Sequence, residues 1–204
     1  MAPRILVNAL NEYFTRFDEI IARYELEKLK TIGDSYMFAS GLPLSRAAHA
    51  VDAVLAALEM VEVVKELGAR DGGTGWNIRI GLHSGPVVAG VVGIRKFAFD
   101  IWGNTVNFAA RMESSGVPGR VNMSERTFRL THGLIDCEAR GQIRIKEGRE
   151  LPMFLAGGPA REFLNGGARN GIPERFAARY REEFSEEPRG FPEVKKALAF
   201  TEQV

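Results

Sequence analysis

The sequence predicts an α+β domain built on a mixed β-sheet. Segments with the apolar period of helices alternate with short strand-like segments, and several of these strand-like segments are joined by turn residues. Helices interleaved with hairpins in this way are typical of α+β folds. The chain has 204 residues, 45% of them hydrophobic, which is enough for one well-packed core.

The first half of the chain predicts two helices and a hairpin. Residues 6–24 place their apolar side chains on one side of a helix. Residues 26–32 and 35–40 have the pattern of two strands that meet at the turn pair Gly33-Asp34. An Ala- and Val-rich helical pattern follows over residues 46–67, and Gly68 is expected to end that helix.

The middle of the chain predicts the remaining sheet. Residues 77–83 and 87–92 are interpreted as a hairpin that turns at Ser84-Gly85-Pro86. A strand over 97–101 leads into a helix over 104–114, and a short strand over 121–123 leads into a short helix over 125–131. Strands over 135–139, 142–146 and 152–155 are expected to complete the sheet.

The composition changes after Leu155, where Gly and Pro pairs punctuate a charged segment. We therefore divide the chain into a domain over 1–155 and a C-terminal extension over 156–204, partly helical or flexible. Phe176, Tyr180 and Phe184 repeat every four residues, which predicts a helix over 174–184 that lies on the domain or on a neighbouring one.

Bulk charge and cysteine content exclude several classes of protein. Lys and Arg total 27 against 26 for Asp and Glu, so there is no excess of positive charge for a long nucleic-acid footprint. The sequence has no apolar run of about 18 residues and no basic-then-apolar start. A lone cysteine, Cys137, fits a reduced setting. We expect a cytoplasmic domain, in a protein that could be membrane-anchored at full length.

The stretch from Phe99 to Arg111 carries the clearest chemical signal. Asp100 lies at the end of a predicted strand, where α/β sheets present ligand groups. Asn107 and Arg111 are four residues apart, so they share one face of the following helix. A carboxylate, an amide and a guanidinium that face one spot suit a base, a sugar and a phosphate.

Four segments resemble the class III nucleotidyl cyclases: KLKTIGDSYM at 28–37, RIGLHSGPV at 79–87, DIWGNTVN at 100–107 and ARMES at 110–114. The resemblance runs from about Leu6 to Leu155. It implies a ferredoxin-like palm that pairs head to tail, as a homodimer or with another cyclase domain, with the nucleotide site across the interface. It also implies that ATP is converted to 3′,5′-cyclic AMP and pyrophosphate, for intracellular signalling. In that reaction the 3′-hydroxyl attacks the α-phosphorus with the help of two Mg²⁺ or Mn²⁺ ions.

The resemblance assigns the base contacts to Lys30 and Asp100. Lysine only donates hydrogen bonds and an ionised aspartate only accepts them, which matches the N1 acceptor and the N6 donor of adenine. Guanine presents the opposite pattern, and guanylate cyclases of this family carry Glu and Cys at these two positions.

The same resemblance implies roles for four further residues. Asp34 matches a metal ligand, Asn107 the residue that positions the ribose, and Arg111 the residue that stabilises the transition state. Lys146 matches a lysine that holds the terminal phosphates, with a plain strand-end lysine as the alternative. The chain has no P-loop or dinucleotide fingerprint, so the glycines at 81, 85, 90 and 93 are expected to allow tight turns and close backbone packing.

One family element is missing from the sequence. Family members begin with a strand of the type Phe-x-Asp-Ile, whose Asp is the other metal ligand, and no such strand precedes the first helix here. We therefore expect weak or no turnover by this chain alone. The alternatives are a fragment of an adenylate cyclase and a catalytically inactive cyclase-like module. Such a module would pair with an intact partner or bind nucleotide without chemistry.

Overall fold

The computed structural model describes residues 3–70, 76–93, 97–144, 150–165 and 167–192. The elements follow in the order α1 (Pro3–Arg23), β1 (Glu27–Ile32), β2 (Ser35–Ala39), α2 (His49–Arg70), β3 (Ile80–Leu82), β4 (Val88–Val92), β5 (Ala98–Trp102), α3 (Asn104–Ser114), β6 (Val121–Ser124), α4 (Glu125–Arg129), β7 (Ile135–Arg144), β8 (Glu150–Pro159), the 3₁₀ turn η1 (Arg161–Phe163), β9 (Ala168–Arg169), β10 (Ile172–Pro173) and α5 (Glu174–Phe184).

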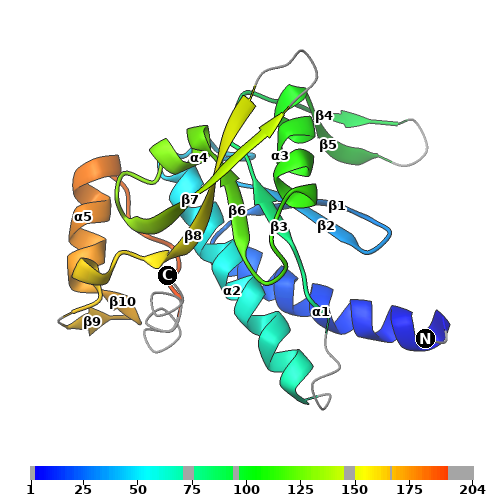
Figure 1. Cartoon of the computed structure of the whole chain (residues 1–204), viewed down its shortest axis with the longest axis horizontal. Helices are drawn as coiled ribbons and strands as arrows, with labels where there is room; N and C mark the ends of the chain where they lie inside the picture. Colours follow the sequence, from blue (N-terminus) through cyan, green and yellow to red (C-terminus); the bar gives the residue numbers. More distant parts are fainter. Residues whose placement is uncertain (1–2, 71–75, 94–96, 145–149, 166, 193–204) are drawn as a thin grey trace.

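The central sheet is mixed, as predicted. Its four strands lie in the order β3-β6-β8-β7, with β3 parallel to β6 and the other pairs antiparallel. Two hairpins, β1–β2 and β4–β5, form separate two-stranded sheets beside it (Figure 1). In the part of the chain that is described, α1 is the first element and no strand precedes it.

The core lies between the sheet and the long helices α1 and α2. Most side chains of α2 are buried, because α1 packs on one side of it and β6 and β8 on another. The predicted face of α1 contributes Tyr13, Phe17, Ile20 and Ile21, all less than 9% exposed. A single hydrophobic cluster continues from this face through α2 and into the C-terminal segment.

The predicted hairpin of residues 77–83 with 87–92 is wrong. β3 pairs in parallel with β6, and β4 pairs with β5 instead. The buried hydroxyl of Ser84 lies 3.2 Å from that of Thr127, which holds the end of β3 against α4. β4 instead pairs antiparallel with β5, the next strand along the chain.

Two further boundaries differ from the prediction. Gly68 lies inside α2, which continues to Arg70, because the surrounding helix face is buried and outweighs the weak helix propensity of glycine. The two strands predicted over 135–139 and 142–146 are one strand, β7, up to Arg144. It has an irregularity between Ala139 and Gln142, where Gly141 has a φ of 82°.

The described part of residues 156–204 includes the end of β8, a small β9–β10 hairpin and α5. α5 spans the residues predicted to be helical, and Phe176, Tyr180 and Phe184 form its buried face. This face packs against the rest of the molecule, so α5 lies on the domain itself (Figure 1).

Candidate active site

Lys30 and Asp100 come together although they are 70 positions apart in the chain. The Lys30 Nζ lies 2.5 Å from the Asp100 Oδ2, across the contact between β1 and β5. The lysine side chain is 41% exposed and the aspartate side chain 18%, so a ligand can reach both. The pair brings a donor and an acceptor to one place on the surface.

The charge state of Asp100 is held by its neighbours. The hydrogen bond from Lys30, followed by one from the Ile101 backbone N–H at 2.9 Å, keeps the pKa of Asp100 below its ordinary value. Ile101 itself is buried and anchors β5 to the core. The carboxylate is therefore a fixed, ionised acceptor at the edge of the hairpin.

Asn107 and Arg111 lie on α3, which begins two residues after β5 ends. Asn107 is exposed and Arg111 is half-buried, and their spacing places them on one face of the helix. Within the residues that the structure describes, neither side chain makes a hydrogen bond or an ion pair. The guanidinium of Arg111 is thus a cation available to an anionic ligand.

α3 is held closely against β3 by contacts that sequence reasoning missed in part. The Asn122 amide donates to the Met112 carbonyl at 2.7 Å, and the Thr105 hydroxyl donates to the Pro86 carbonyl at 2.6 Å. A Cβ on Gly81 would lie 1.9 Å from the Glu113 backbone nitrogen, so the two backbones touch. Close packing by Gly81 was predicted, but no sequence signal singles out Asn122 or Thr105.

Asp34 lies in the β1–β2 turn, where Gly33 adopts a φ of 63°. Its side chain is exposed, and the described residues contain no group of three or more His, Cys, Asp or Glu that could hold a metal ion. A single exposed carboxylate fits a magnesium ion bound mainly through phosphate oxygens and water, but not a cage built by the protein. Lys146 lies outside the described residues.

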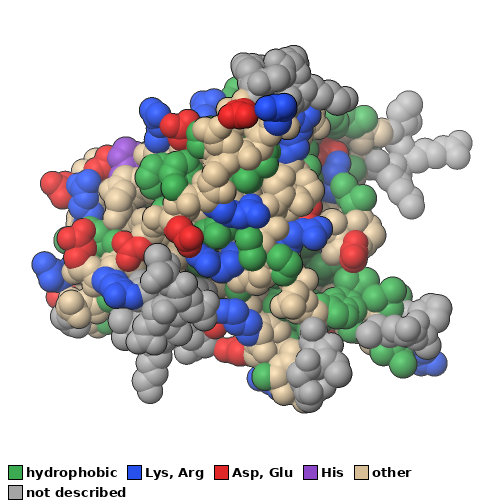
Figure 2. All heavy atoms as spheres, in the orientation of Figure 1, with side chains coloured by type: hydrophobic (Ala, Val, Ile, Leu, Met, Phe, Trp, Pro, Cys, Tyr) green, Lys and Arg blue, Asp and Glu red, His purple; other side chains and the backbone are tan. Residues whose placement is uncertain are grey.

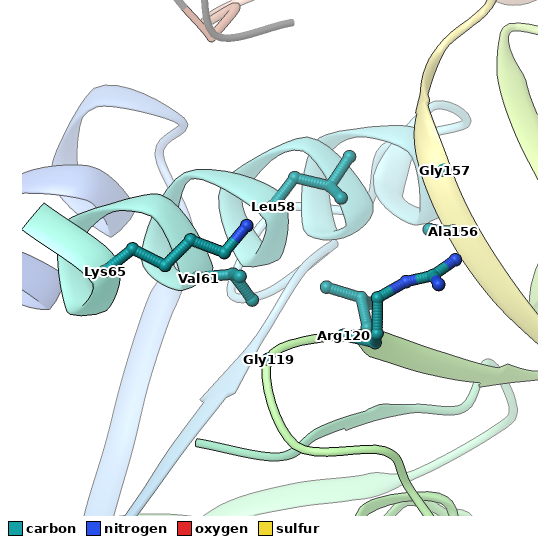
Figure 3. A pocket seen from close by; sticks show the side chains of 8 residues that line it. Leu58, Val61, Lys65, Gly119, Arg120, Ala156 and Gly157 are labelled. Carbon is teal, nitrogen blue, oxygen red and sulfur yellow. The ribbon is translucent and has the colours of Figure 1, made fainter. Parts of the chain in front are cut away.

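Two hollows in the surface lie away from these residues. A cavity of about 10 Å³ between α2 and the strands β6 and β8 is lined in part by Lys65 and Arg120, and it has room for little more than one water molecule (Figure 3). A larger one, about 180 Å³, lies between α1 and α2. Neither is lined by a candidate site residue, so neither is the nucleotide site.

Exposed hydrophobic side chains flank the candidate site. On the β4–β5 hairpin and its connection they are Val88, Val91, Val92, Phe97 and Trp102, between 42% and 78% exposed. Ile32, at the end of β1, is 63% exposed, and Ile5, Leu6 and Val7 at the start of α1 are also exposed. Figure 2 shows hydrophobic side chains gathered over this side of the molecule. Apolar patches of this kind mark interaction surfaces.

A four-stranded mixed sheet with two hairpins beside it is the architecture of an α+β domain, and the Lys30–Asp100 pair joins the two hairpins. The chain belongs to the adenylate and guanylate cyclase catalytic domain family, whose profile matches residues 1–157. The family resemblance read from the four motifs is thereby confirmed.

Relatives of both substrate types are similar to the chain. Guanylyl cyclase C of Mus musculus is 40% identical over 169 residues, which cover 79% of this chain and 16% of that protein. An adenylate cyclase of Mycobacterium tuberculosis is 39% identical over 145 residues, which cover 71% and 32%. The chain thus spans less than a third of the length of these two proteins.

A solved structure confirms the fold. The guanylate cyclase domain of RhGC from Catenaria anguillulae, in complex with GTP, is similar with a TM-score of 0.71 and 32% identity, covering 76% of this chain and 85% of that chain. The fold expected from the resemblance is therefore correct.

In the described residues, no helix is both long and apolar enough to cross a membrane.

Proposed function

We propose that this domain acts on ATP and produces 3′,5′-cyclic AMP and pyrophosphate. The observation that carries the proposal is the Lys30–Asp100 pair, 2.5 Å apart and open to solvent. An ammonium next to a carboxylate offers a donor for adenine N1 and an acceptor for the adenine N6 amino group. Guanine would place a donor against the lysine and an acceptor against the aspartate.

The proposed roles of the α3 residues follow from their place on the helix. Asn107 offers an amide that orients the ribose. Arg111, one turn further on, stabilises the charge that develops on the α-phosphate, and a preorganised donor of this kind is typically worth about 10²–10³ in rate. Because α3 is packed closely against β3, the backbone that carries Arg111 has a fixed place beside the site.

Class III cyclases generally depend on divalent metal ions, and we propose Asp34 as the ligand that this chain contributes, with Mg²⁺ or Mn²⁺ as the ion. When bound, the metal would acidify the 3′-hydroxyl and neutralise phosphate charge. Lys146 is proposed to hold the terminal phosphates as a point charge.

A head-to-tail homodimer, or a pair with another cyclase domain, would complete the site. The candidate residues line no hollow described above, and exposed apolar side chains of the β4–β5 hairpin flank them. A partner seated on this hairpin would bury the apolar surface and enclose the nucleotide.

A catalytically inactive, nucleotide-binding cyclase module is the second candidate. It is favoured by the exposed carboxylate of Asp34, since the described residues contain no group of three or more His, Cys, Asp or Glu that could hold a metal ion. The two candidates differ in product formation and share ATP binding.

The test is to incubate the purified chain with ATP or GTP and Mn²⁺ or Mg²⁺, and to measure cyclic nucleotide and thermal shift. The chain is assayed alone and mixed with an intact cyclase domain that lacks its own α3 arginine. Cyclic AMP from the mixture supports the proposed activity. An ATP-dependent thermal shift without product in either assay supports the inactive module, and no response to either nucleotide rejects both.

Substrate choice is tested by the double variant Lys30→Glu, Asp100→Cys. Each mismatched buried polar contact costs about 1–3 kcal/mol, so we expect the preference for ATP over GTP to invert. Measuring kcat/KM for both nucleotides in the active assembly checks this. An unchanged preference would mean that the pair does not contact the base.

A further inference from the structure

Most of the C-terminal extension (156–204) lies beyond the family match over 1–157, and its described part from residue 158 to residue 192 is firmly joined to the core. Phe176 and Tyr180 are fully buried. The rings of Phe176 and Phe191 meet edge to face at 4.8 Å, and those of Tyr180 and Phe184 at 5.1 Å. This aromatic cluster fixes both α5 and the segment that follows it.

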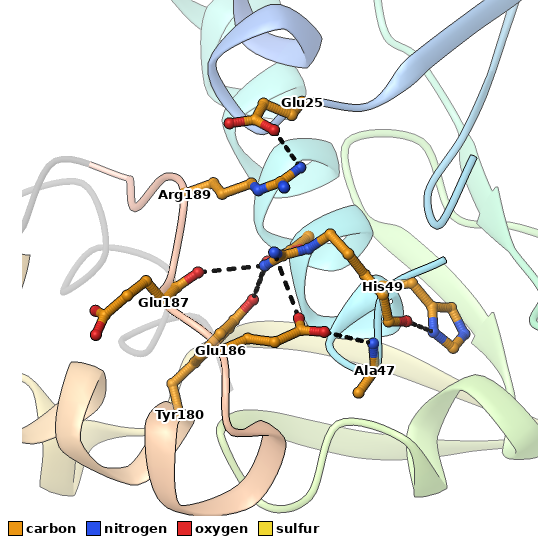
Figure 4. A network of polar contacts seen from close by, with 9 residues as sticks. Glu25, Ala47, His49, Tyr180, Glu186, Glu187 and Arg189 are labelled. Carbon is orange, nitrogen blue, oxygen red and sulfur yellow. Dashed lines mark hydrogen bonds and ion pairs between the residues drawn. The ribbon is translucent and has the colours of Figure 1, made fainter. Parts of the chain in front are cut away.

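A buried polar network joins the extension to the start of α2 (Figure 4). The Asp52 carboxylate, 1% exposed, accepts hydrogen bonds from the Tyr180 hydroxyl at 2.7 Å and from the Arg46 Nε at 2.9 Å. Glu186 accepts one from the Ala47 backbone N–H at 2.9 Å. The segment after α5 is therefore directed back across the molecule by partners in the loop before α2.

This segment ends against the junction between α1 and β1. A Cβ on Gly190 would lie 2.6 Å from the Tyr24 Cε1, so the backbone at Gly190 packs directly on the face of the buried tyrosine ring. The Tyr24 hydroxyl donates a hydrogen bond to Glu59 of α2, which links the ring to that helix. Arg189 forms an ion pair with Glu25 (Figure 4).

The junction between α1 and β1 determines where β1 begins and in which direction it runs. Glu25 has a φ of 53°, a left-handed conformation that reverses the chain between the helix and the strand. β1 begins at Glu27, and Lys30 follows within the same strand. A shift of the segment at Gly190 would therefore displace Tyr24 and Glu25, and with them the root of β1.

We propose that the C-terminal extension is a positioning element for β1, and that the contact of Gly190 with Tyr24 sets the place of Lys30 relative to Asp100. The proposal rests on the base-reading role of these two residues given above. Gly190 and Tyr24 act through β1 and do not touch the nucleotide. In this way, residues that lie beyond the family match would affect how the domain recognises the base.

The experiment compares Gly190→Ala with Gly167→Ala in the full chain. Neither glycine has a φ in the left-handed region, so a methyl group is the main change. At Gly190 the methyl meets the Tyr24 ring, whereas at Gly167 the nearest atom is 3.7 Å away on Glu174, an ordinary contact. Comparing the two variants therefore distinguishes a steric clash with Tyr24 at the α1–β1 junction from a general effect of placing alanine in the extension.

Two quantities are measured beside the thermal midpoint. Amide hydrogen exchange over residues 27–39 reports the β1–β2 hairpin without nucleotide. The ratio of kcat/KM for ATP and GTP in the active assembly reports base recognition, which a general loss of stability would not change. We expect Gly190→Ala to speed exchange in the hairpin and to lower the ATP preference several-fold, while Gly167→Ala leaves both unchanged.

A Gly190→Ala chain that is less stable overall, with native exchange in the hairpin and a native nucleotide ratio, would overturn the proposal and leave the extension a structural cover. So would equal effects of both variants. If the native chain turns over neither nucleotide in any assembly, the proposed function fails. The exchange comparison still decides whether the extension controls β1.

Discussion

At the scale of single residues, the ammonium of Lys30 affects the protonation of the Asp100 carboxyl group with which it is paired. The hydrogen bond from Lys30 is the largest cause of the lowered pKa of Asp100. A folded-state pKa below the unfolded one stabilises the fold at higher pH, and this contribution is lost as pH falls through the folded pKa. The carboxylate of Asp100, the proposed acceptor for the base, therefore stays ionised below the ordinary pKa of an aspartate.

The variant Lys30→Met tests this coupling. Without the ammonium, we expect the pKa of Asp100 to rise toward its ordinary value of 3.8. An NMR titration of the Asp100 carboxyl carbon in native and variant chains measures the change. Lys28→Met is the matched control: Lys28 lies in the same strand as Lys30 but pairs with Asp18 of α1, so its removal should leave the Asp100 titration as it is. Equal pKa values in native and Lys30→Met chains would contradict the pairing.

Cys137 gives a second prediction at this scale. Burial and the neighbouring Asp136 charge raise the pKa of its thiol to about 12, and its Sγ is turned toward the Ile135 carbonyl at 3.3 Å. Since the thiolate is the reactive form, the folded chain should react slowly with a disulfide reagent at mildly alkaline pH. Full reaction is expected in urea, where the only cysteine becomes accessible. Equal rates with and without urea would show that this thiol is not protected.

At the scale of elements, the contact between α3 and β3 leaves the least space for an added side-chain atom. The variant Gly81→Ala would put a methyl group 1.9 Å from the Glu113 backbone nitrogen, and backbone cannot move aside as a flexible side chain can. Overpacking of this kind costs about 1–3 kcal/mol, so we expect a lower free energy of unfolding in urea and a large loss of product formation in the mixed assay. Gly90→Ala, whose nearest contact is 3.7 Å away on Trp102, is the control for stability. Similar urea midpoints for both variants would contradict the close packing of α3 against β3.

The type of an element, helix or strand, could be predicted where its apolar residues repeat with a single clear spacing. α1 and α5 follow their apolar spacing because a single face of each packs on the core. α2 extends past Gly68, since burial on several sides replaces the amphipathic signal that would have marked its end. β3 was assigned the wrong partner because strand patterns carry no information on which neighbour they pair with. Its partner β6 lies about forty residues further on in the chain.

At the scale of the whole molecule, the site depends on contacts that no local pattern contains. The spacing of Asn107 and Arg111 predicted a shared face, as these residues lie on one helix. Only the family resemblance placed Lys30 with Asp100, since β1 and β5 are brought together by the fold. The network of Asp52, Arg46 and Tyr180 was missed entirely, because its members are remote in sequence and individually ordinary.

Assembly is the last property of the whole molecule, and it gives the last prediction. Phe97 is 78% exposed at the β4–β5 hairpin, so Phe97→Glu should change the free energy of unfolding of a single chain by less than about 0.5 kcal/mol. If the hairpin is seated on a partner, a buried charge there opposes association. We expect the variant to sediment as a smaller species than the native chain and to lose product formation in the mixed assay.

The control for this prediction is Leu44→Glu, because Leu44 is 75% exposed but lies in the loop before α2. It adds the same charge and removes a similar apolar area, yet it should leave both sedimentation and activity unchanged. Loss of association in both variants would indicate a general effect of charge. Association retained in Phe97→Glu would place the interface elsewhere, and the nucleotide site would then need another way to exclude water.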